Sequence, residues 1–463
     1  MEAKDKQKQF ILNESLSKIM WKFSLPAIAA MVLFGLNAFM DTVYIGQLMN
    51  ETALAGVALA YPLTSILLGL GSWAGTGAAN LLSIALGDED LNTQQNILSN
   101  ATLFAIFSTV FIAAPCYFFA EPLIRMMGGE GDILAAGVEY FKITMLAAPF
   151  WVYGLTLNMI IRGEGKMPTA AFMMTYGLVI NLILTPLFIA VFDMGVGGAA
   201  WATNIGMLIY CLVGYRYFLK GKASFVSEIN SLSYHKGVFQ SIMKMGFPGF
   251  IMTVMSLIQA IVVFNAIVHN GTDSDLAFFA GANRFLFFLM TPLFGLMRAL
   301  QPVLGINYGA GQYERVKQSF WLFTRTGIYL VAPFWVILIV FPGESMSLVL
   351  PDMSFSPQDL INVRIYMLVL PMLPLVFMAL TFFPAIKEEK HASIIGLARQ
   401  LVFYVPAMLL LPGLFGVEWV YYGSTLIDVI VTIWILMIVM KLFKKLTGEK
   451  PKPKNQEALA VQN

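Results

Sequence analysis

A series of long apolar stretches restricts the fold of this sequence more than any other feature. Each is at least as long as the roughly 20 residues that a helix needs to cross the hydrocarbon core of a bilayer. Charged residues make up only 12% of the 463 residues, about half the share in a typical soluble domain, so most of the outer surface must face lipid. Backbone polar groups in lipid must be bonded within the protein, and stretches of this length achieve that as helices. The sequence therefore predicts an all-α polytopic membrane protein.

We predict twelve transmembrane helices, with both termini in the cytoplasm. In this arrangement most of the 29 Lys and Arg residues fall in cytoplasmic segments, as the positive-inside rule requires. Arg162 and Arg399 are counted among these cytoplasmic residues, whereas Arg284 and Arg298 lie inside spans. We thus expect a multi-pass protein of the cell (inner or plasma) membrane. The predicted spans are residues 23–45, 54–83, 96–119, 133–161, 167–191, 196–219, 244–268, 275–308, 318–341, 361–386, 392–412 and 416–441.

The two halves of the chain resemble each other at an offset of about 222 residues. Pro26 corresponds to Pro248, and Gly87, at the end of the second span, corresponds to Gly309. Six spans per half is an even number, so the repeats are parallel and are related by an axis along the membrane normal. Two such lobes around a central cavity favour a transporter over a channel. The predicted parts are a cytoplasmic segment 1–22, a first lobe 23–219, a linker 220–243, a second lobe 244–444 and a cytoplasmic tail 445–463.

Several classes of protein are excluded by composition. The net charge of +2 provides no basic field for nucleic acid. Two cysteines and three scattered histidines form neither a disulfide framework nor a metal cluster. No phosphate-binding loop supports direct use of ATP. We therefore expect neither an enzyme nor a cofactor, apart from a coupling ion.

Polar residues inside the spans of the first half predict a cation site. Asp41 is a carboxylate in an apolar span, which is costly in lipid and hence a functional candidate. Asn37 lies one turn before it on the same face. Asn181 and Thr185 form a second i, i+4 pair beside Pro186, and Thr203 lies in the next span. Their oxygens suit a hard cation such as Na⁺, and a buried carboxylate can equally take up a proton.

The second half has different polar residues at the corresponding places. Gln259 stands where the first half has Asn37, and Val263 where it has Asp41. Arg284 and Arg298 lie in the eighth span and Asp428 in the twelfth. Two interpretations of the arginines remain: contact with an anionic group of a substrate or lipid, or a structural pair, for Arg298 with Asp428 or with backbone carbonyls.

The order of several motifs resembles the multidrug and toxic compound extrusion (MATE) family, in its DinF-like branch. The resemblance extends over nearly the whole chain, and no single motif decides it. The similar stretches are Ser24-Leu25-Pro26, Asp41-Thr42-Val43-Tyr44-Ile45-Gly46, Ala85-Leu86-Gly87, Ile161-Arg162-Gly163-Glu164-Gly165, Asn181 to Phe188, Gly195 to Thr203, and Gln301-Pro302 with Asn307-Tyr308-Gly309-Ala310-Gly311.

This resemblance implies export of drugs or metabolites by antiport with H⁺ or Na⁺. It places the coupling cation at Asp41, Asn181 and Thr203, and makes Pro26 the point where the first helix bends. Family members often have a second carboxylate in span five, at the position that Thr185 occupies here. With one negative charge fewer, Na⁺ binding should weaken, which favours H⁺ carried by Asp41.

The expected partners are a small, amphipathic substrate and membrane lipids, and we expect a monomer that binds no nucleic acid. The alternative function is a flippase for a lipid or a lipid-linked oligosaccharide with a similar two-lobe plan. Arg284 and Arg298 favour it mildly, because a phosphate headgroup is well bound by arginine.

Overall fold

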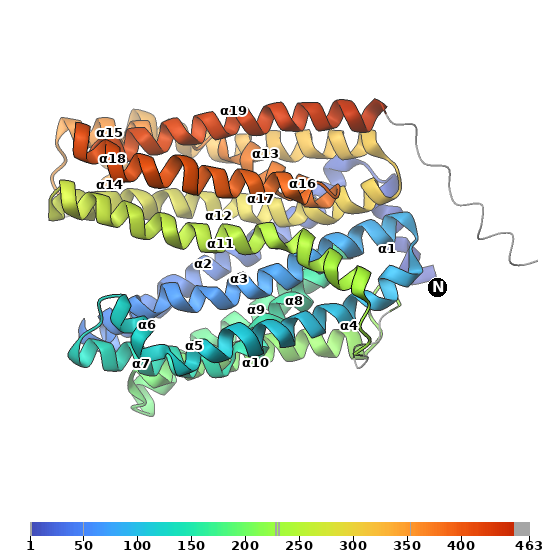
Figure 1. Ribbon diagram of the computed structural model, residues 1–463, viewed down its shortest axis with the longest axis horizontal. Coiled ribbons are helices and arrows are strands. Elements are labelled where there is room, and N and C mark those ends of the chain that lie inside the picture. Colours follow the sequence, from blue (N-terminus) through green and yellow to red (C-terminus); the bar gives the residue numbers. More distant parts are fainter. Residues whose placement is uncertain (1, 50, 227–228, 230–231, 352, 449–463) are drawn as a thin grey trace, which may run out of the picture.

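The computed structural model describes residues 2–49, 51–226, 229, 232–351 and 353–448. These residues form helices joined by short connections, and none of them forms a strand. The ribbons make two helical bundles that meet near the amino terminus and diverge toward the opposite end (Figure 1). We call helices α2 to α10 the first lobe and helices α11 to α19 the second lobe.

The first lobe follows a short amino-terminal helix, α1 (Glu2–Asn13). The sixth predicted span is the helix α10. The third contains a π-helical turn between α4 and α5, and the fifth ends in one directly after Pro186. The helices of this lobe are α2 (Leu16–Leu48), α3 (Glu51–Asp88), α4 (Leu91–Ser108), η1 (Thr109–Ala113), α5 (Ala114–Phe118), α6 (Ala120–Met126), α7 (Gly131–Leu146), α8 (Ala148–Gly163), α9 (Met167–Pro186), η2 (Leu187–Val191) and α10 (Gly195–Leu219).

The second lobe has the same order of long helices, but two of its spans are interrupted. One span is divided into α15 and α16, and another contains a long π-helical segment, η3. The helices are α11 (Lys236–Asn270), α12 (Asp273–Gly309), α13 (Tyr313–Val340), α14 (Pro342–Ser347), α15 (Pro357–Met367), α16 (Leu373–Ala385), α17 (Glu389–Leu397), η3 (Ala398–Tyr404), α18 (Val405–Phe415) and α19 (Trp419–Gly448).

The predicted twelve-helix fold class is confirmed. Ten helices of the described chain are long and apolar enough to cross a membrane, and an eleventh span is the pair α7 and α8, bent by 54°. The remaining predicted span, the tenth at residues 361–386, corresponds to α15 and the shorter apolar helix α16. The division into lobes, linker and tail stays a prediction; α11 already begins inside the predicted linker, and residues 227, 228, 230, 231 and 449–463 lie outside the described residues.

Close helix packing joins the two lobes at the amino-terminal end. A Cβ atom added to Gly309 of α12 would overlap the carbonyl oxygen of Ile84 in α3, and one added to Gly87 of α3 would overlap that of Ile306 in α12. Gly87 and Gly309 are the residues related by the repeat. Only glycine lets the two backbones approach so closely, so this pair of glycines holds the lobes together at this end.

The helix α1 makes a second connection between the lobes at the same end. Gln7 donates to the carbonyl oxygen of Gly165 in the first lobe at 2.9 Å. Arg315 of α13 donates to the carbonyl oxygens of Ile11 at 3.0 Å and Glu14 at 2.9 Å. These two carbonyls at the end of α1 have no partner within that helix, and a cation there also interacts favourably with the helix dipole.

A buried carboxylate fixes the chain after α10 to the loop before α9. Glu164 is 1% exposed and accepts hydrogen bonds from the Tyr217 hydroxyl and from the backbone N–H of Ser224. Burial raises the pKa of the Glu164 carboxyl, and the nearby Lys166 opposes that rise. These hydrogen bonds hold the start of the connection to the second lobe, at Ser224, against the first lobe.

Candidate functional site

The predicted polar residues of the first half come together in one cluster between α2, α9 and α10. Asn37 Nδ2 donates to Asn181 Oδ1 at 2.6 Å. Asn181 Nδ2 donates to Thr203 Oγ1 at 3.1 Å and to Thr185 Oγ1 at 3.3 Å. Asp41 Oδ1 accepts from Thr185 Oγ1 at 3.5 Å. All five residues thus form one hydrogen-bonded network, which is what the i, i+4 spacings predict.

Two orientations of the Asn181 amide are compatible with this network. When the amide is turned over, its nitrogen donates to Asp41 Oδ1 at 3.3 Å, and its oxygen accepts from Thr203 Oγ1 at 3.1 Å. The turned orientation gives the carboxylate a second donor. In either orientation the Asn181 amide stays bonded to Thr203, because an amide carries both an acceptor and donors.

Asp41 has no positively charged partner in the described part of the chain; none of the ion pairs there includes it. The side chains around it are amides, hydroxyls and apolar groups, and Asn37, Asn181 and Thr185 are all buried. A carboxylate in such surroundings is stabilised by binding a cation or a proton. The oxygens of Asp41, Asn181, Thr185 and Thr203 are of the types that Na⁺ binds in proteins.

Two tyrosines near this cluster were missed in the sequence. The charge of Asp41 acts on the hydroxyls of Tyr61 in α3 and Tyr140 in α7, and the Tyr140 hydroxyl also contacts Thr203. Tyr140 is buried and Tyr61 is 53% exposed. Tyrosines in apolar spans resemble ordinary packing or interface residues, and the threonines one turn after them, Thr64 and Thr144, donate to their backbone carbonyls as hydroxyls in helices commonly do. No sequence signal distinguished them from the other 15 tyrosines.

In the corresponding region of the second lobe, the side chain of Arg399 is held by an ion pair and a hydrogen bond. Arg399 Nε donates to Asp428 Oδ1 at 2.8 Å, and its Nη1 donates to Gln259 Oε1 at 3.1 Å. The guanidinium carbon lies 5.5 Å from the ring centre of Tyr404. Gln259 is the repeat-related counterpart of Asn37. The guanidinium of Arg399 is therefore a permanent positive charge at the place where the first lobe has the cluster around Asp41.

This arrangement corrects two sequence interpretations. Asp428 pairs with Arg399 at 2.8 Å, so the suggested pair between Asp428 and Arg298 is wrong. Arg399 is not a residue of a cytoplasmic segment, because it lies in η3 within the span Glu389–Phe415. The predicted span 392–412 already contains Arg399, and its side chain bonds to Gln259 of α11 and Asp428 of α19.

We predict that Arg399→Leu lowers the apparent melting temperature by several degrees. Removing one member of a largely buried ion pair leaves the other charge without compensation, which costs about 3–5 kcal/mol in soluble proteins. The double variant Arg399→Leu with Asp428→Leu should recover much of this loss, because it leaves no single charge. Thermal unfolding in one detergent measures both. A single variant as stable as the wild type would contradict the prediction.

The remaining candidates lie apart from these clusters. Arg284 is exposed on α12. Arg298, about four turns further along the same helix, is partly buried. Arg162, which was assigned to a cytoplasmic loop, is instead buried in α8 at 3% exposure. Pro26 lies inside α2, where it removes one backbone hydrogen bond and permits a bend.

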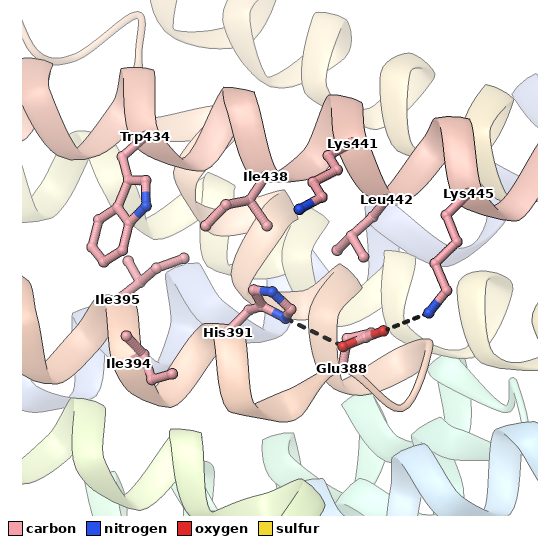
Figure 2. A pocket seen from close by; sticks show the side chains of 9 residues that line it. All are labelled: Glu388, His391, Ile394, Ile395, Trp434, Ile438, Lys441, Leu442 and Lys445. Atoms are coloured by element: carbon pink, nitrogen blue, oxygen red, sulfur yellow. Dashed lines mark hydrogen bonds and ion pairs between the residues drawn. The ribbon is translucent and has the colours of Figure 1, made fainter.

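A separate cavity of about 450 Å³ lies between α17 and α19 in the second lobe. Figure 2 shows Glu388 among the residues that line it, with His391 on one side and Lys445 on the other. Glu388 Oε2 lies 3.3 Å from His391 Nδ1, and its Oε1 lies 3.4 Å from Lys445 Nζ. Glu388 is therefore paired within the cavity, where Lys441 adds a further positive charge, and none of the lining residues belongs to the cluster around Asp41. In the described residues no three His, Cys, Asp or Glu side chains are grouped as metal ligands.

Comparison with known proteins agrees with the repeated architecture. The model of the MatE family matches residues 26–187 and again residues 248–409. The second match begins 222 residues after the first, at the offset of the sequence repeat. The chain belongs to the MatE family. Family membership confirms a transporter rather than an enzyme; assignment to the DinF-like branch stays a prediction.

Relatives and solved structures of this family resemble the chain over nearly its full length. Multidrug export protein MepA from Staphylococcus saprophyticus is 23% identical over 447 residues, which are 96% of this chain and 98% of that protein. MepA from Staphylococcus aureus is 23% identical over 449 residues, with the same coverage. A crystal structure of a MATE protein in a bent conformation has a TM-score of 0.89 at 21% identity, covering 96% of this chain and 98% of that one. A MOP superfamily transporter from Pyrococcus furiosus, described by a reversed polarity of its binding pocket, has a TM-score of 0.87 at 22% identity, covering 96% and 99%.

Proposed function

We propose that this MATE transporter exports small amphipathic organic compounds in exchange for protons, and that Asp41 carries the proton. The observation on which the proposal rests is a carboxylate without a positively charged partner, joined by hydrogen bonds to Thr185 and, through it, to Asn181. The names of the related multidrug export proteins support drug-like substrates. The protein would work as a monomer with both termini in the cytoplasm.

Proton coupling is favoured over Na⁺ coupling by the number of charges in the cluster. Asp41 is its single carboxylate, and Thr185 contributes a neutral hydroxyl. Binding Na⁺ in a largely buried site requires its positive charge to be well compensated, whereas a proton neutralises Asp41 directly. Release of the proton is assisted by Asn181, since its turned amide donates to the ionised carboxylate. We infer that Asp41 is neutral when it carries the proton, and that it accepts a hydrogen bond from Asn181 when it is ionised.

Alternating access supplies the coupling step. The lobes are joined at the amino-terminal end by the glycine contact between α3 and α12, and the ribbons diverge at the other end (Figure 1). With both termini in the cytoplasm, we infer that this arrangement is the outward-facing state. Protonation of Asp41 there, followed by a change of Pro26-containing α2, would close the outer end and open the inner one. The flippase alternative shares this cycle, and differs only in the substrate.

Transport into inside-out vesicles separates the two coupling ions. With a pH gradient alone, acid inside, uptake of a fluorescent lipophilic cation should proceed and should stop when nigericin with K⁺ collapses the gradient. With an imposed Na⁺ gradient at uniform pH, uptake should equal that of vesicles without the protein. Uptake driven by Na⁺ alone would contradict proton coupling and would assign the cluster to Na⁺.

A further inference from the structure

Two arginines, Arg162 buried and Arg298 partly buried, lie on helices that meet at the interface between the lobes. Arg162 projects from α8 of the first lobe and Arg298 from α12 of the second, two helices that are in contact. The positive charges of the two side chains act on one another, and both act on the hydroxyl of Tyr210 in α10. Helix α8 also packs against α10, so Arg162, Arg298 and Tyr210 come from both lobes, on three helices that meet at α8, and we call these three residues the arginine triangle.

Neither arginine has an acidic partner in the described part of the chain. Arg162 is 3% exposed, and its Nη1 atom makes no hydrogen bond. Its Nη2 atom contacts only the sulfur of Met174, at 3.9 Å, and sulfur is a weak acceptor. Arg298 makes no hydrogen bond or ion pair with any described residue, in contrast to Arg399, which binds Asp428. Because Arg162 is buried, its charge without a partner is so unfavourable that it points to a ligand absent from the protein itself.

Further unpaired polar groups lie on α12 close to Arg298 and on α2, which packs against α12. Gln301 lies one turn after Arg298 on α12, and its Nε2 donor is buried without an acceptor. Ser24 lies one turn before Ile28, the residue of α2 that packs against Gly295 of α12, and its hydroxyl is buried without a partner. Both groups can donate hydrogen bonds. Nearly all buried polar groups in proteins have partners, so unsatisfied donors at one place are a second sign of a missing acceptor.

One buried acceptor without a partner lies close to Arg162 in the sequence, but it does not bind the arginine. Asn158 lies one turn before Arg162 on α8, and its Oδ1 atom is also buried without a donor. Its Nδ2 donates to the carbonyl oxygen of Ala170 at 2.8 Å, which fixes the orientation of the amide. Arg162 therefore leaves even this neutral oxygen unused, and its Nη1 remains available.

We propose that the arginine triangle binds the oxyanion group, a carboxylate or a phosphate, of an amphipathic ligand that enters between the lobes. A guanidinium group donates paired hydrogen bonds that match both groups, and Tyr210 and Gln301 add neutral donors. Without an anion, two like charges oppose the approach of the lobes; with one, the same charges become a bridge. Binding would thus favour closure of the lobes at the amino-terminal end. The site does not depend on how Asp41 is coupled, and its test needs no ion gradient.

Equilibrium binding to the purified protein in phosphatidylcholine nanodiscs tests this site. The probes are octyl phosphate and octanoate, with octyltrimethylammonium as the cation of similar tail length. We expect the wild type to bind both anions, and Arg298→Gln and Arg162→Gln to weaken anion binding by at least about 10-fold, the loss expected for one charged hydrogen bond. Arg325→Gln, which removes an exposed arginine on α13, is the matched control and should bind like the wild type. Binding of the cation should not change in any variant.

A second arm identifies the source of the oxyanion. Nanodiscs that contain phosphatidylglycerol are analysed for lipid retained by the wild type and by Arg298→Gln after exchange into phosphatidylcholine. Retention by the wild type alone assigns the site to a lipid headgroup, and anion binding without such retention assigns it to a solute. Equal binding of octyl phosphate and octanoate by the wild type and both arginine variants, with no lipid retained, would overturn the proposal. Should Arg162→Gln fail to fold, Arg298→Gln still decides, because Arg298 is only partly buried.

Discussion

Asp41→Asn is expected to abolish proton-driven efflux while leaving the protein folded. Asparagine has nearly the shape of aspartic acid and can keep the hydrogen bond from Thr185, which links Asp41 to the network at 3.5 Å. It cannot gain or lose a proton between pH 5 and pH 8. Substrate uptake driven by a pH gradient in inside-out vesicles should therefore fall to the level of vesicles without the protein, and should not recover at any pH in this range.

The matched control for this substitution is Asp88→Asn. Asp88 is an exposed carboxylate at the end of α3, outside the polar cluster, and its loss removes the same charge from the chain. It should transport like the wild type. Substrate binding without a gradient should persist in both variants, because coupling and binding are different steps. Gradient-driven uptake by Asp41→Asn at the rate of Asp88→Asn would remove Asp41 from the mechanism.

The cluster around Asp41 could be predicted from sequence because each lobe helix carries very few polar residues there. Asn37 with Asp41 and Asn181 with Thr185 share a helix face by their spacing of four, and a polar group in lipid needs a partner. The span map left only a few helices that could supply it. That these side chains lie within hydrogen-bond distance is a consequence of packing, which the order of the helices in the chain does not reveal.

Polar residues near the ends of spans were harder to interpret. Arg162 and Arg399 both look like cytoplasmic anchors in a count of basic residues, yet both lie inside the helix bundle. A count along the chain cannot detect the ion pair between Arg399 and Asp428. It also cannot show that α8 contacts α12, which brings Arg162 toward Arg298. Contacts between the lobes depend on tertiary packing, and repeat symmetry alone predicts only which helices are equivalent.

Gly309→Ala is expected to shift the protein toward the state that is open at its amino-terminal end. The added methyl group would overlap the carbonyl oxygen of Ile84 where α12 crosses α3. Backbone cannot move aside as a side chain can, so the cost falls on the state in which the lobes meet. Overpacking of this kind costs about 1–3 kcal/mol, which changes a two-state equilibrium by about 5- to 150-fold. Since the opposite state separates α3 from α12, it should tolerate the methyl group.

Spin-label distances measure this shift directly, with one pair of labels across the lobes at each end of the molecule. In Gly309→Ala the distance at the amino-terminal end should lengthen and that at the other end should shorten, and efflux should slow at least about 5-fold by the same free-energy difference. Gly237→Ala is the control, because a Cβ atom at Gly237, in the first turn of α11, meets no atom within 4 Å. Unchanged distances in Gly309→Ala, with only a lower melting temperature, would mean that α3 and α12 stay in contact throughout the cycle. The lobes would then pivot about this glycine contact instead of separating there.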